Sequence, residues 1–421
     1  MLNVIYDGTI LLNMMNKDSS RSGVFFCVKN VFDELRKNPN VSLSLYFAPE
    51  HILKAMKFKE LYAKDVQCVN IIPKPSFWLL INKFFWAVHT KLFTHKYLRL
   101  PFSVGILFSQ KAMRYFHRNC YKKEIVQSSQ VFLAPARMVP KSIRCNSNLL
   151  FFTILHDAIP LLSDYMGSAE TKNHELLIRS FGQRDYFFPN SKQTESDFKK
   201  FSHLITSSTS FVIPHAASSE IRQILDCDSI EKVKTKYGIP KEKKYVFSLC
   251  TLEPRKNLLR AVGTFCSFVK KYDIADLVWV LGGGHWDAFL KEMDKECIQW
   301  NPNIIIKTGY IDDEDRSALY SGAEWFVYTS RYEGFGVPPL EAMQCGCPVI
   351  TSNSSSLPEV VGDAGIMIDW DSDEQHVEAY KKYYFDEELR KENSRKGLER
   401  AKMFSWKKTV DKMIDVMISR F

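Results

Sequence analysis

The chain has 421 residues, a hydrophobic fraction of 45%, a charged fraction of 25% and a formal net charge of +9. This composition is typical of a globular protein and excludes a disordered or collagen-like chain, while the length favours two domains of about 200 residues each. The ten cysteines are scattered without a C-x-x-C pair, which argues against a structural zinc site and favours a reducing compartment.

The chain opens with an apolar strand at Leu2–Asp7, continues through a loop that ends at Gly23, and enters a helix from about Val24 to Arg36. This order predicts a doubly wound α/β domain, whose ligands bind beyond the carboxyl ends of the strands. The opening residues lack the basic leader and long apolar core of a signal peptide, and no apolar stretch predicts a transmembrane helix. We therefore expect a cytoplasmic protein.

Residues 52–123 form a basic, aromatic-rich segment that interrupts the α/β pattern. Fourteen Lys or Arg stand there against two acids, so this segment supplies the whole basic excess of the chain. The pattern between Phe77 and Phe116 predicts helices. They could dock on an anionic membrane surface, bind nucleic acid, or simply turn their aromatic side chains to the core. Membrane docking is favoured because basic helices with Trp and Phe suit anionic interfaces, whereas no recognised nucleic-acid-binding module accompanies the charge.

Apolar strands resume after this segment, until a polar passage at 221–240 that we interpret as a linker between two domains. Beyond it we predict a second α/β unit of five strands. These strands are Tyr245–Leu249, Val278–Leu281, Ile304–Lys307, Trp325–Tyr328 and Val349–Thr351. The expected domains are 1–220 and 241–403, followed at 404–421 by an amphipathic helix.

The most informative motif follows a predicted strand and runs from Glu333 to Glu341, with a Gly-Phe-Gly turn before Pro338 and Pro339. Prolines can start a helix because the first turn needs no amide donor from them. Four backbone amides would then face a crevice at a helix amino terminus, which suits a diphosphate. They belong to Gly334, Phe335, Gly336 and Val337. The two glutamates would repel a diphosphate, so we expect them to bind the hydroxyl groups of a sugar and a ribose.

Glu333-x7-Glu341 with the intervening Gly-Phe-Gly-Val-Pro resembles the signature of the family-4 (group 1) retaining glycosyltransferases of the GT-B fold. The likeness covers 245–369 well and the first half loosely. It implies an α/β architecture of two Rossmann-like domains facing each other across a cleft, with the C-terminal helix crossing back to the N-terminal domain. It also implies that Glu341 binds the donor ribose and that Glu333 contacts the transferred sugar.

The resemblance assigns further donor-binding residues upstream. Lys256, with Arg255 beside it, would neutralise the donor diphosphate. Many relatives have an arginine where Thr251 stands, so Arg255 is expected to substitute for it. Tyr310 would lie beside the donor base.

In the first domain the resemblance places His156 at the edge of the cleft, in contact with the transferred sugar or its leaving phosphate. Asp157 would help to shape the acceptor site. Gly23 would let the backbone approach the donor phosphate, and its neighbour Arg21 is a candidate for binding an anionic acceptor.

We therefore expect a retaining enzyme that moves a hexose-type sugar from a nucleotide-diphosphate sugar to a glycan or lipid-linked acceptor, in bacterial surface polysaccharide or lipopolysaccharide assembly. Fixed cations and amide dipoles can stabilise the departing diphosphate, so we expect no metal and no cofactor. The triplets Asp226-Cys-Asp228 and Asp369-Trp-Asp371 are interpreted as coincidental.

The sequence leaves other functions open: a different GT-B enzyme, such as a phosphorylase or sugar-nucleotide epimerase, or a non-catalytic nucleotide-sugar-binding partner. Peripheral attachment to the inner face of the cytoplasmic membrane is an alternative to a purely cytoplasmic location.

Overall fold

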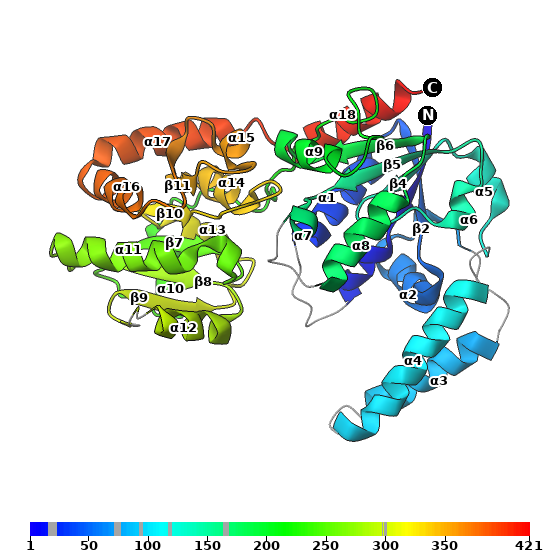
Figure 1. Cartoon of the computed structure of the whole chain (residues 1–421), viewed down its shortest axis with the longest axis horizontal. Helices are drawn as coiled ribbons and strands as arrows, with labels where there is room; N and C mark the ends of the chain where they lie inside the picture. Colours follow the sequence, from blue (N-terminus) through cyan, green and yellow to red (C-terminus); the bar gives the residue numbers. More distant parts are fainter. Residues whose placement is uncertain are drawn as a thin grey trace.

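The computed structural model describes residues 1–15, 23–70, 77–91, 96–116, 120–162, 168–296, 298 and 301–421. Within these residues the chain forms two α/β domains, each built on a six-stranded parallel sheet (Figure 1). The strands β4 (Val131–Ala134) and β8 (Leu277–Gly282) are buried along their whole length. Such continuous apolar runs are expected for parallel strands that are covered by helices on both faces.

The first sheet has the order β3-β2-β1-β4-β5-β6. Its strands are β1 (Leu2–Asp7), β2 (Val41–Tyr46), β3 (Gln67–Cys68), β4, β5 (Leu150–Leu155) and β6 (Asp185–Pro189). Its helical segments are η1 (Thr9–Met15), α1 (Gly23–Lys37), η2 (Pro49–His51), α2 (Ile52–Tyr62), α5 (Lys123–Ser128), α6 (Lys141–Arg144), α7 (Ile159–Leu162), α8 (Ser168–Arg179) and α9 (Lys192–Lys199).

The second sheet has the order β12-β11-β10-β7-β8-β9. Its strands are β7 (Lys244–Leu249), β8, β9 (Ile305–Gly309), β10 (Trp325–Tyr328), β11 (Val349–Ser352) and β12 (Gly365–Ile368). Its helical segments are α10 (Cys227–Lys236), η3 (Pro254–Lys256), α11 (Leu258–Lys271), α12 (Trp286–Lys295), α13 (Arg316–Ser321), α14 (Val337–Gln344), α15 (Leu357–Val361), α16 (Asp373–Phe385) and α17 (Glu387–Ala401).

The second sheet was predicted with five strands, and this number was wrong. It has a sixth strand, β12, which pairs with β11 at the edge of the sheet. The polar passage at 221–240, interpreted as a linker, contains the helix α10. The Asp226 carboxylate caps α10 by accepting a hydrogen bond from the Ser229 amide.

The C-terminal helix α18 (Trp406–Ile418) crosses back to the N-terminal domain, as the resemblance implied (Figure 1). Its buried face joins the hydrophobic core beneath α1 and β1. This face consists of Trp406, Val410, Met413, Ile414 and Met417. Ser405 caps the helix, and the Thr409 hydroxyl donates to the carbonyl of Pro214 at 2.7 Å.

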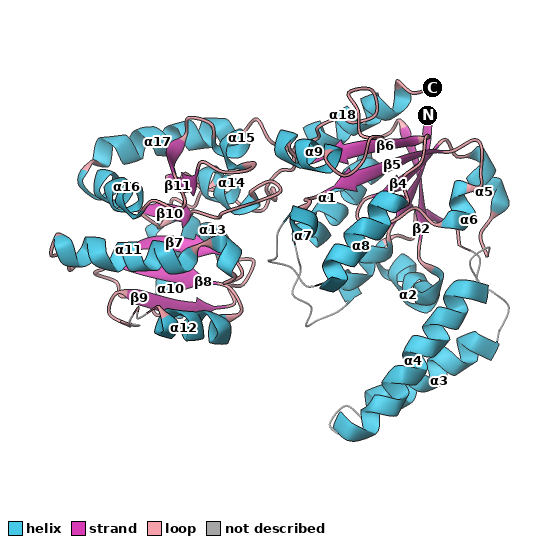
Figure 2. Ribbon diagram, in the orientation of Figure 1, coloured by secondary structure: helices cyan, strands magenta, loops and turns pink. Residues whose placement is uncertain are grey.

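The basic segment contains two long helices, α3 (Phe77–Lys91) and α4 (Lys96–Phe116), which lie against each other and project from the N-terminal domain (Figure 2). Of the helices in the described ranges, none combines the length and the apolar character needed to cross a membrane.

Candidate functional site

The centre of the candidate site lies where the second sheet changes direction. Strands β7 and β10 are neighbours, and the chain proceeds outward from them to opposite edges of the sheet. Ligands of open α/β sheets bind at this point, beyond the carboxyl ends of the strands. The turn after β7 carries Arg255 and Lys256, and the loop after β10 carries Glu333. The amide of Arg331 donates to the carbonyl of Arg255 at 2.9 Å, which ties the two segments together.

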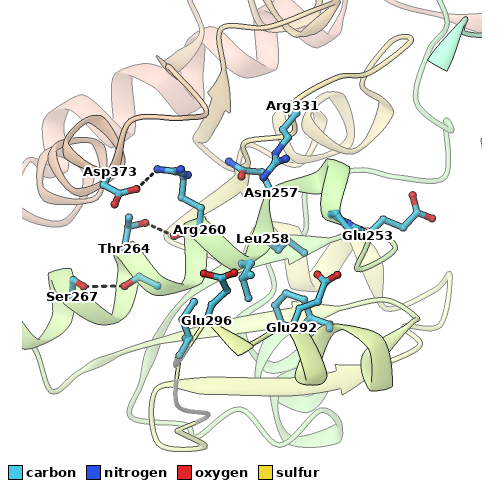
Figure 3. Close-up of a pocket in the computed structure, with 15 residues that line it drawn as sticks. Glu253, Asn257, Leu258, Arg260, Thr264, Ser267, Glu292, Glu296, Arg331 and Asp373 are labelled. Atoms are coloured by element: carbon cyan, nitrogen blue, oxygen red, sulfur yellow. Dashed lines mark hydrogen bonds and ion pairs between the residues drawn. The ribbon is translucent and has the colours of Figure 1, made fainter. Parts of the chain in front are cut away.

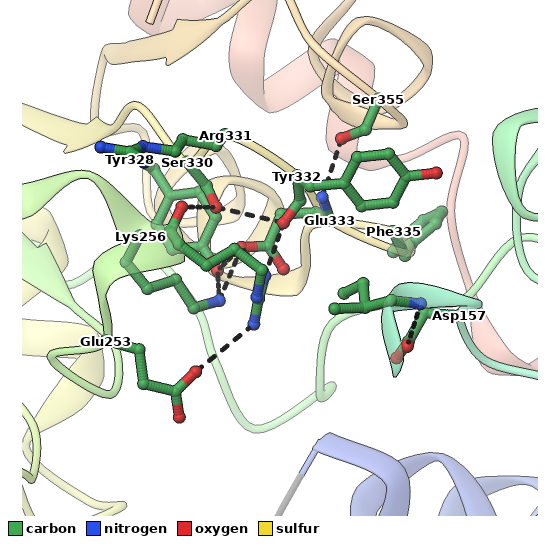
Figure 4. Close-up of polar contacts among 12 residues, drawn as sticks. Asp157, Glu253, Lys256, Tyr328, Ser330, Arg331, Tyr332, Glu333, Phe335 and Ser355 are labelled. Atoms are coloured by element: carbon green, nitrogen blue, oxygen red, sulfur yellow. Dashed lines mark hydrogen bonds and ion pairs between the residues drawn. The ribbon is translucent and has the colours of Figure 1, made fainter. Parts of the chain in front are cut away.

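A buried ion cluster joins these segments (Figure 4). The ammonium of Lys256 lies 2.6 Å from a carboxylate oxygen of Glu333, and a guanidinium nitrogen of Arg255 lies 3.0 Å from the same oxygen. The hydroxyl of Tyr328 donates to it at 3.1 Å. Burial tends to raise the pKa of Glu333, but the two cations outweigh burial and hold that pKa below its usual range. Glu333 is therefore ionised at neutral pH.

The amino terminus of α14 borders this cluster. Gly336 has a φ of 115°, a conformation that favours glycine, and Pro338 stands in the first turn of the helix. Among the described residues no protein group accepts a hydrogen bond from the amides of 334–337. The hydroxyl of Ser356 donates to the carbonyls of Glu333 and Phe335, at 3.0 and 2.7 Å, and so fixes the loop. This arrangement is suited to binding an anion.

Glu341 lies one turn into α14 and is buried. Its carboxylate accepts hydrogen bonds from Arg316 at 3.1 Å and from Tyr320 at 3.0 Å. Burial raises the pKa of Glu341, and the charge of Arg316 and the Tyr320 hydrogen bond oppose this rise only in part. Sequence reasoning missed Arg316, because it lies at the start of α13 with no motif around it. Its guanidinium also lies 5.9 Å from the ring centroid of Phe26, on α1 of the other domain.

The two domains meet at Gly334. A Cβ atom there would collide with the carbonyl oxygen of His156 and with the side chain of Asp157. The carbonyl of Gly334 accepts hydrogen bonds from the hydroxyls of Ser191 at 2.7 Å and Thr194 at 3.1 Å. The predicted residues of the first domain, His156 and Asp157, are therefore brought to the loop that holds Glu333.

His156 is held by its Nε2 atom, 2.6 Å from the carbonyl oxygen of Pro135. Since a carbonyl only accepts, Nε2 carries a proton and Nδ1 is an acceptor in the neutral ring. Burial lowers the pKa of His156, although this hydrogen bond acts in the opposite direction. The carboxylate of Asp157 accepts from the amide of Ile159 at 3.1 Å and so supports the start of α7.

His156 also belongs to a cluster that the sequence did not indicate. Ligand atoms of Cys27, His156 and His215 lie within 4.8 Å of one another, an arrangement that could hold a metal ion. The Cys27 sulfur lies 3.3 Å from Nε2 of His215, and burial raises the pKa of the thiol. Without a metal ion, this contact is a hydrogen bond between the thiol and the imidazole.

Other predicted residues lie less centrally. Tyr310 is 73% exposed, and Thr251 is also exposed. Gly23 opens α1, and a Cβ atom there would meet nothing within 4 Å. Arg21 lies outside the described residues.

A pocket of about 410 Å³ lies between α11 and α12, next to the turn that follows β7 (Figure 3). Four carboxylates and two guanidinium groups line it, and Arg260 is engaged with Asp373. This charge balance is wrong for a diphosphate.

The acidic triplets have structural contacts. The Asp226 side chain caps α10, while Asp371 pairs with Arg260 at 2.7 Å. The carboxylate of Asp369 accepts a hydrogen bond from the backbone amide of Asp371 at 3.0 Å. These contacts agree with the interpretation of both triplets as coincidental.

Comparison with known proteins gives a match over residues 229–400 to the family described as "Glycosyl transferases group 1". The serotype-specific mannosyltransferase WbdA of Escherichia coli is 28% identical over 289 residues, which cover 67% of this chain and 34% of that protein. O-antigen chain mannosyltransferase B of Escherichia coli is 47% identical over 176 residues, 41% of this chain and 45% of the relative. The aligned regions thus span between about one third and one half of these relatives.

Solved structures support the GT-B fold over the whole chain. Anabaena Alr3699/HepE, solved in complex with UDP and glucose, aligns over 100% of both chains with a TM-score of 0.64 and 14% identity. WaaG, a glycosyltransferase involved in lipopolysaccharide biosynthesis, aligns over 99% of both chains with a TM-score of 0.61 and 13% identity. The two-domain architecture implied by the resemblance is confirmed.

Proposed function

We propose that this chain transfers a hexose-type sugar, with retention, from a nucleotide-diphosphate sugar to a glycan or lipid-linked acceptor, because residues 229–400 match the family of group 1 glycosyltransferases. Bacterial surface polysaccharide is the proposed product, since relatives include a serotype-specific mannosyltransferase and an O-antigen chain mannosyltransferase. Those relatives also make mannose the first sugar to test.

The observation that carries this proposal is the cluster of Arg255, Lys256 and Glu333 beside the amino terminus of α14. Cleavage of the anomeric bond leaves negative charge on the diphosphate while the sugar becomes oxocarbenium-like. Fixed cations and amide dipoles aimed at the developing charge give the largest contribution to such a reaction. Two cations converge on one carboxylate oxygen here, and Arg255 also lies 3.7 Å from the partly exposed Glu253, whose place a diphosphate would take.

Each remaining group has a role consistent with its chemistry. With the diphosphate on Lys256 and Arg255, Glu333 accepts hydrogen bonds from sugar hydroxyls. Glu341, held by Arg316 and Tyr320, accepts from the ribose. His156 is neutral because its pKa is lowered, so its Nδ1 atom accepts from a sugar hydroxyl rather than pairing with phosphate.

The proposed mechanism needs neither a protein nucleophile nor a metal ion. The acceptor attacks on the face that the diphosphate leaves, and the departing phosphate oxygen takes the acceptor proton. Lys256, Arg255 and the α14 amides supply the charge stabilisation that a divalent ion provides in other enzymes. Full activity in EDTA is therefore expected.

The test is a transfer assay with GDP-mannose and UDP-glucose as donors, in EDTA, using Lys256→Met and a matched control, Lys396→Met. Lys396 pairs with Glu392 on α17, 33% exposed and away from the cleft. Lys256→Met should lose transfer by about 10²-fold or more, while Lys396→Met retains it. Equal rates for both variants, or a requirement for added metal, would contradict the proposed site.

A further inference from the structure

Among the described residues, the hairpin formed by α3 and α4 contacts the N-terminal domain at its base. Helix α4 contacts η2, and the buried side chain of Met113 packs against Ile52 at the start of α2. From there both helices project from the body of the N-terminal domain (Figure 1). The donor site described above includes no residue of the hairpin.

Two polar side chains lie inside the described part of the hairpin, beside the buried apolar Ile106. Asn82 is 3% exposed and donates to the hydroxyl of Ser109 at 2.8 Å, and Ser109 is fully buried. The Ser109 hydroxyl donates in turn to the carbonyl of Ile106 at 2.9 Å. At Gly105 a Cβ atom would collide with the ring of Phe85, so the helices approach closely. A glycine contact and an Asn–Ser hydrogen bond between helices are typical of helix pairs in lipid.

The exterior of the hairpin is apolar. Six large hydrophobic side chains there are between 56% and 62% exposed. They are Leu80, Phe84, Val104, Leu107, Phe108 and Tyr115. The four on α4 are spaced at i, i+3, i+4 and i+11, so they form one stripe along the helix. Apolar side chains gathered in an exposed stripe mark a surface that contacts a partner or a membrane.

The charge around this apolar surface is of one sign. From Val66 to Lys123 the sequence contains no Asp or Glu. Lys83 and Lys111 are exposed next to the apolar residues of α3 and α4. Like charge opposes pairing with the same hairpin of a second copy, whereas it complements an anionic surface.

A groove of about 700 Å³ near the base of the hairpin also combines apolar side chains with lysines. It is lined by apolar side chains, including Ile52 and Met56, by Lys59, Lys64 and Lys122, and by one acid, Glu60. Lysines thus outnumber acids in this groove, which lies next to the contact of α2 with α4.

We propose that the α3–α4 hairpin embeds its exposed apolar face in the interfacial layer of a bilayer that contains anionic phospholipid. The lysines then bind lipid headgroups, while the Asn82–Ser109 contact holds the helices together where water is excluded. Helix α4 is about 32 Å long, but Lys111 within its apolar stripe favours lying in the interface over crossing the bilayer. This inference does not depend on the proposed transfer reaction.

The test is co-sedimentation of the full chain with vesicles of phosphatidylcholine, with and without phosphatidylglycerol. The variants are Leu107→Ser/Phe108→Ser and Lys83→Glu/Lys111→Glu, all at exposed positions. The matched control is Lys172→Glu/Leu176→Ser on α8, where both residues are also exposed. Far-ultraviolet circular dichroism and thermal melting verify that each variant is folded.

The wild type and the α8 control should bind only the anionic vesicles, and each hairpin variant should lose at least about tenfold in affinity. Nucleoside-diphosphate binding should be the same in all proteins, which separates this test from that of the donor site. Wild-type binding that ignores lipid charge, an absence of binding, or hairpin variants that bind like the control would overturn the proposal. Binding of an acidic protein without vesicle binding would likewise overturn it in favour of a protein partner.

Discussion

At the scale of single residues, Lys256 and Glu333 depend on each other for stability as well as for chemistry. Their side chains are 9% and 10% exposed, so each neutralises a charge that burial would otherwise penalise. Removing one partner of a buried pair leaves the other uncompensated, at a cost of about 3–5 kcal/mol. Loss of activity after a single substitution must therefore be separated from loss of folding.

Glu333→Gln should reduce transfer by about 10²-fold or more, because the amide cannot accept sugar hydroxyls as a carboxylate does. It should also lower the free energy of unfolding, since Lys256 and Arg255 keep their charges. The double variant Lys256→Met/Glu333→Gln should recover part of that stability without recovering transfer. Urea denaturation and transfer rates measure the two effects, with Glu392→Gln as the surface control. Wild-type transfer by Glu333→Gln would remove this residue from the site.

Two buried histidines and the half-buried His156 predict an acid-sensitive fold. Burial lowers the pKa values of His156, His215 and His376 in the folded state. Below pH 6.5 the unfolded chain therefore binds protons that the folded chain does not. As the pH decreases, the free energy of unfolding decreases by up to about 1.4 kcal/mol per pH unit for each histidine.

His215→Gln should make this pH dependence shallower between about pH 6.5 and 5. Urea unfolding of the wild type, His215→Gln and the exposed-site control His203→Asn across that range measures the slope. If the free energy of unfolding of His215→Gln depended on pH as steeply as that of the wild type, His215 would not be a source of the acid sensitivity.

The sequence predicted site residues where a motif lies at the end of a strand, and missed those that tertiary packing supplies. Glu333 and Lys256 follow adjacent strands, so the rule for strand ends brought them together. Arg316 lies on another helix, 25 residues before Glu341 in the sequence, and no local sequence pattern predicts that it binds Glu341. Tyr310 was carried over by resemblance alone, and its exposure leaves its role a prediction.

At the scale of elements, the loop of Gly334 fits against the N-terminal domain without space for a side chain. Gly334→Ala should push this loop from His156 and reduce transfer by about 10²-fold, the cost of a displacement near 1 Å in a reacting site. Each domain should remain folded, because Gly334 lies between the two cores. Gly263→Ala, within α11, is the control. Transfer assays and near-ultraviolet circular dichroism measure these effects, and wild-type transfer by Gly334→Ala would show that the contact is unimportant.

Elements with a long periodic pattern were predictable, and short ones were not. The spacing of Val410, Met413, Ile414 and Met417 predicted a helix within 404–421, and α18 spans Trp406–Ile418. Strand β12 has only four residues, too few for a pattern to stand out. Helix α10 is mostly polar, with Lys234 as its buried side chain, and so resembled a linker.

At the scale of the whole molecule, α18 makes the last residues of the chain part of the first domain. Met413 is fully buried in the N-terminal core. Met413→Ala should lower the free energy of unfolding by about 2–5 kcal/mol through lost burial and a cavity. Met403→Ala, at a side chain 61% exposed, is the control.

Hydrogen exchange should place the effect of Met413→Ala in β1 and α1, far from position 413 in the sequence. If protection fell only in the second domain, the crossing of α18 would not stabilise the first.

The arrangement of the domains was the part least accessible from residue patterns. Parallel strands separated by helices predict each α/β domain, but the placement of one against the other came from the family resemblance. In the structure, the contact of Gly334 with His156 and the reach of Arg316 to Phe26 bring the two domains together around the proposed donor site.

The most direct measurement is a crystal structure with a nucleoside diphosphate, grown in EDTA. The account predicts the diphosphate within hydrogen-bonding distance of the Lys256 ammonium and the amides at the start of α14, with the ribose on Glu341. A nucleotide bound elsewhere, such as in the acidic pocket between α11 and α12, would contradict it.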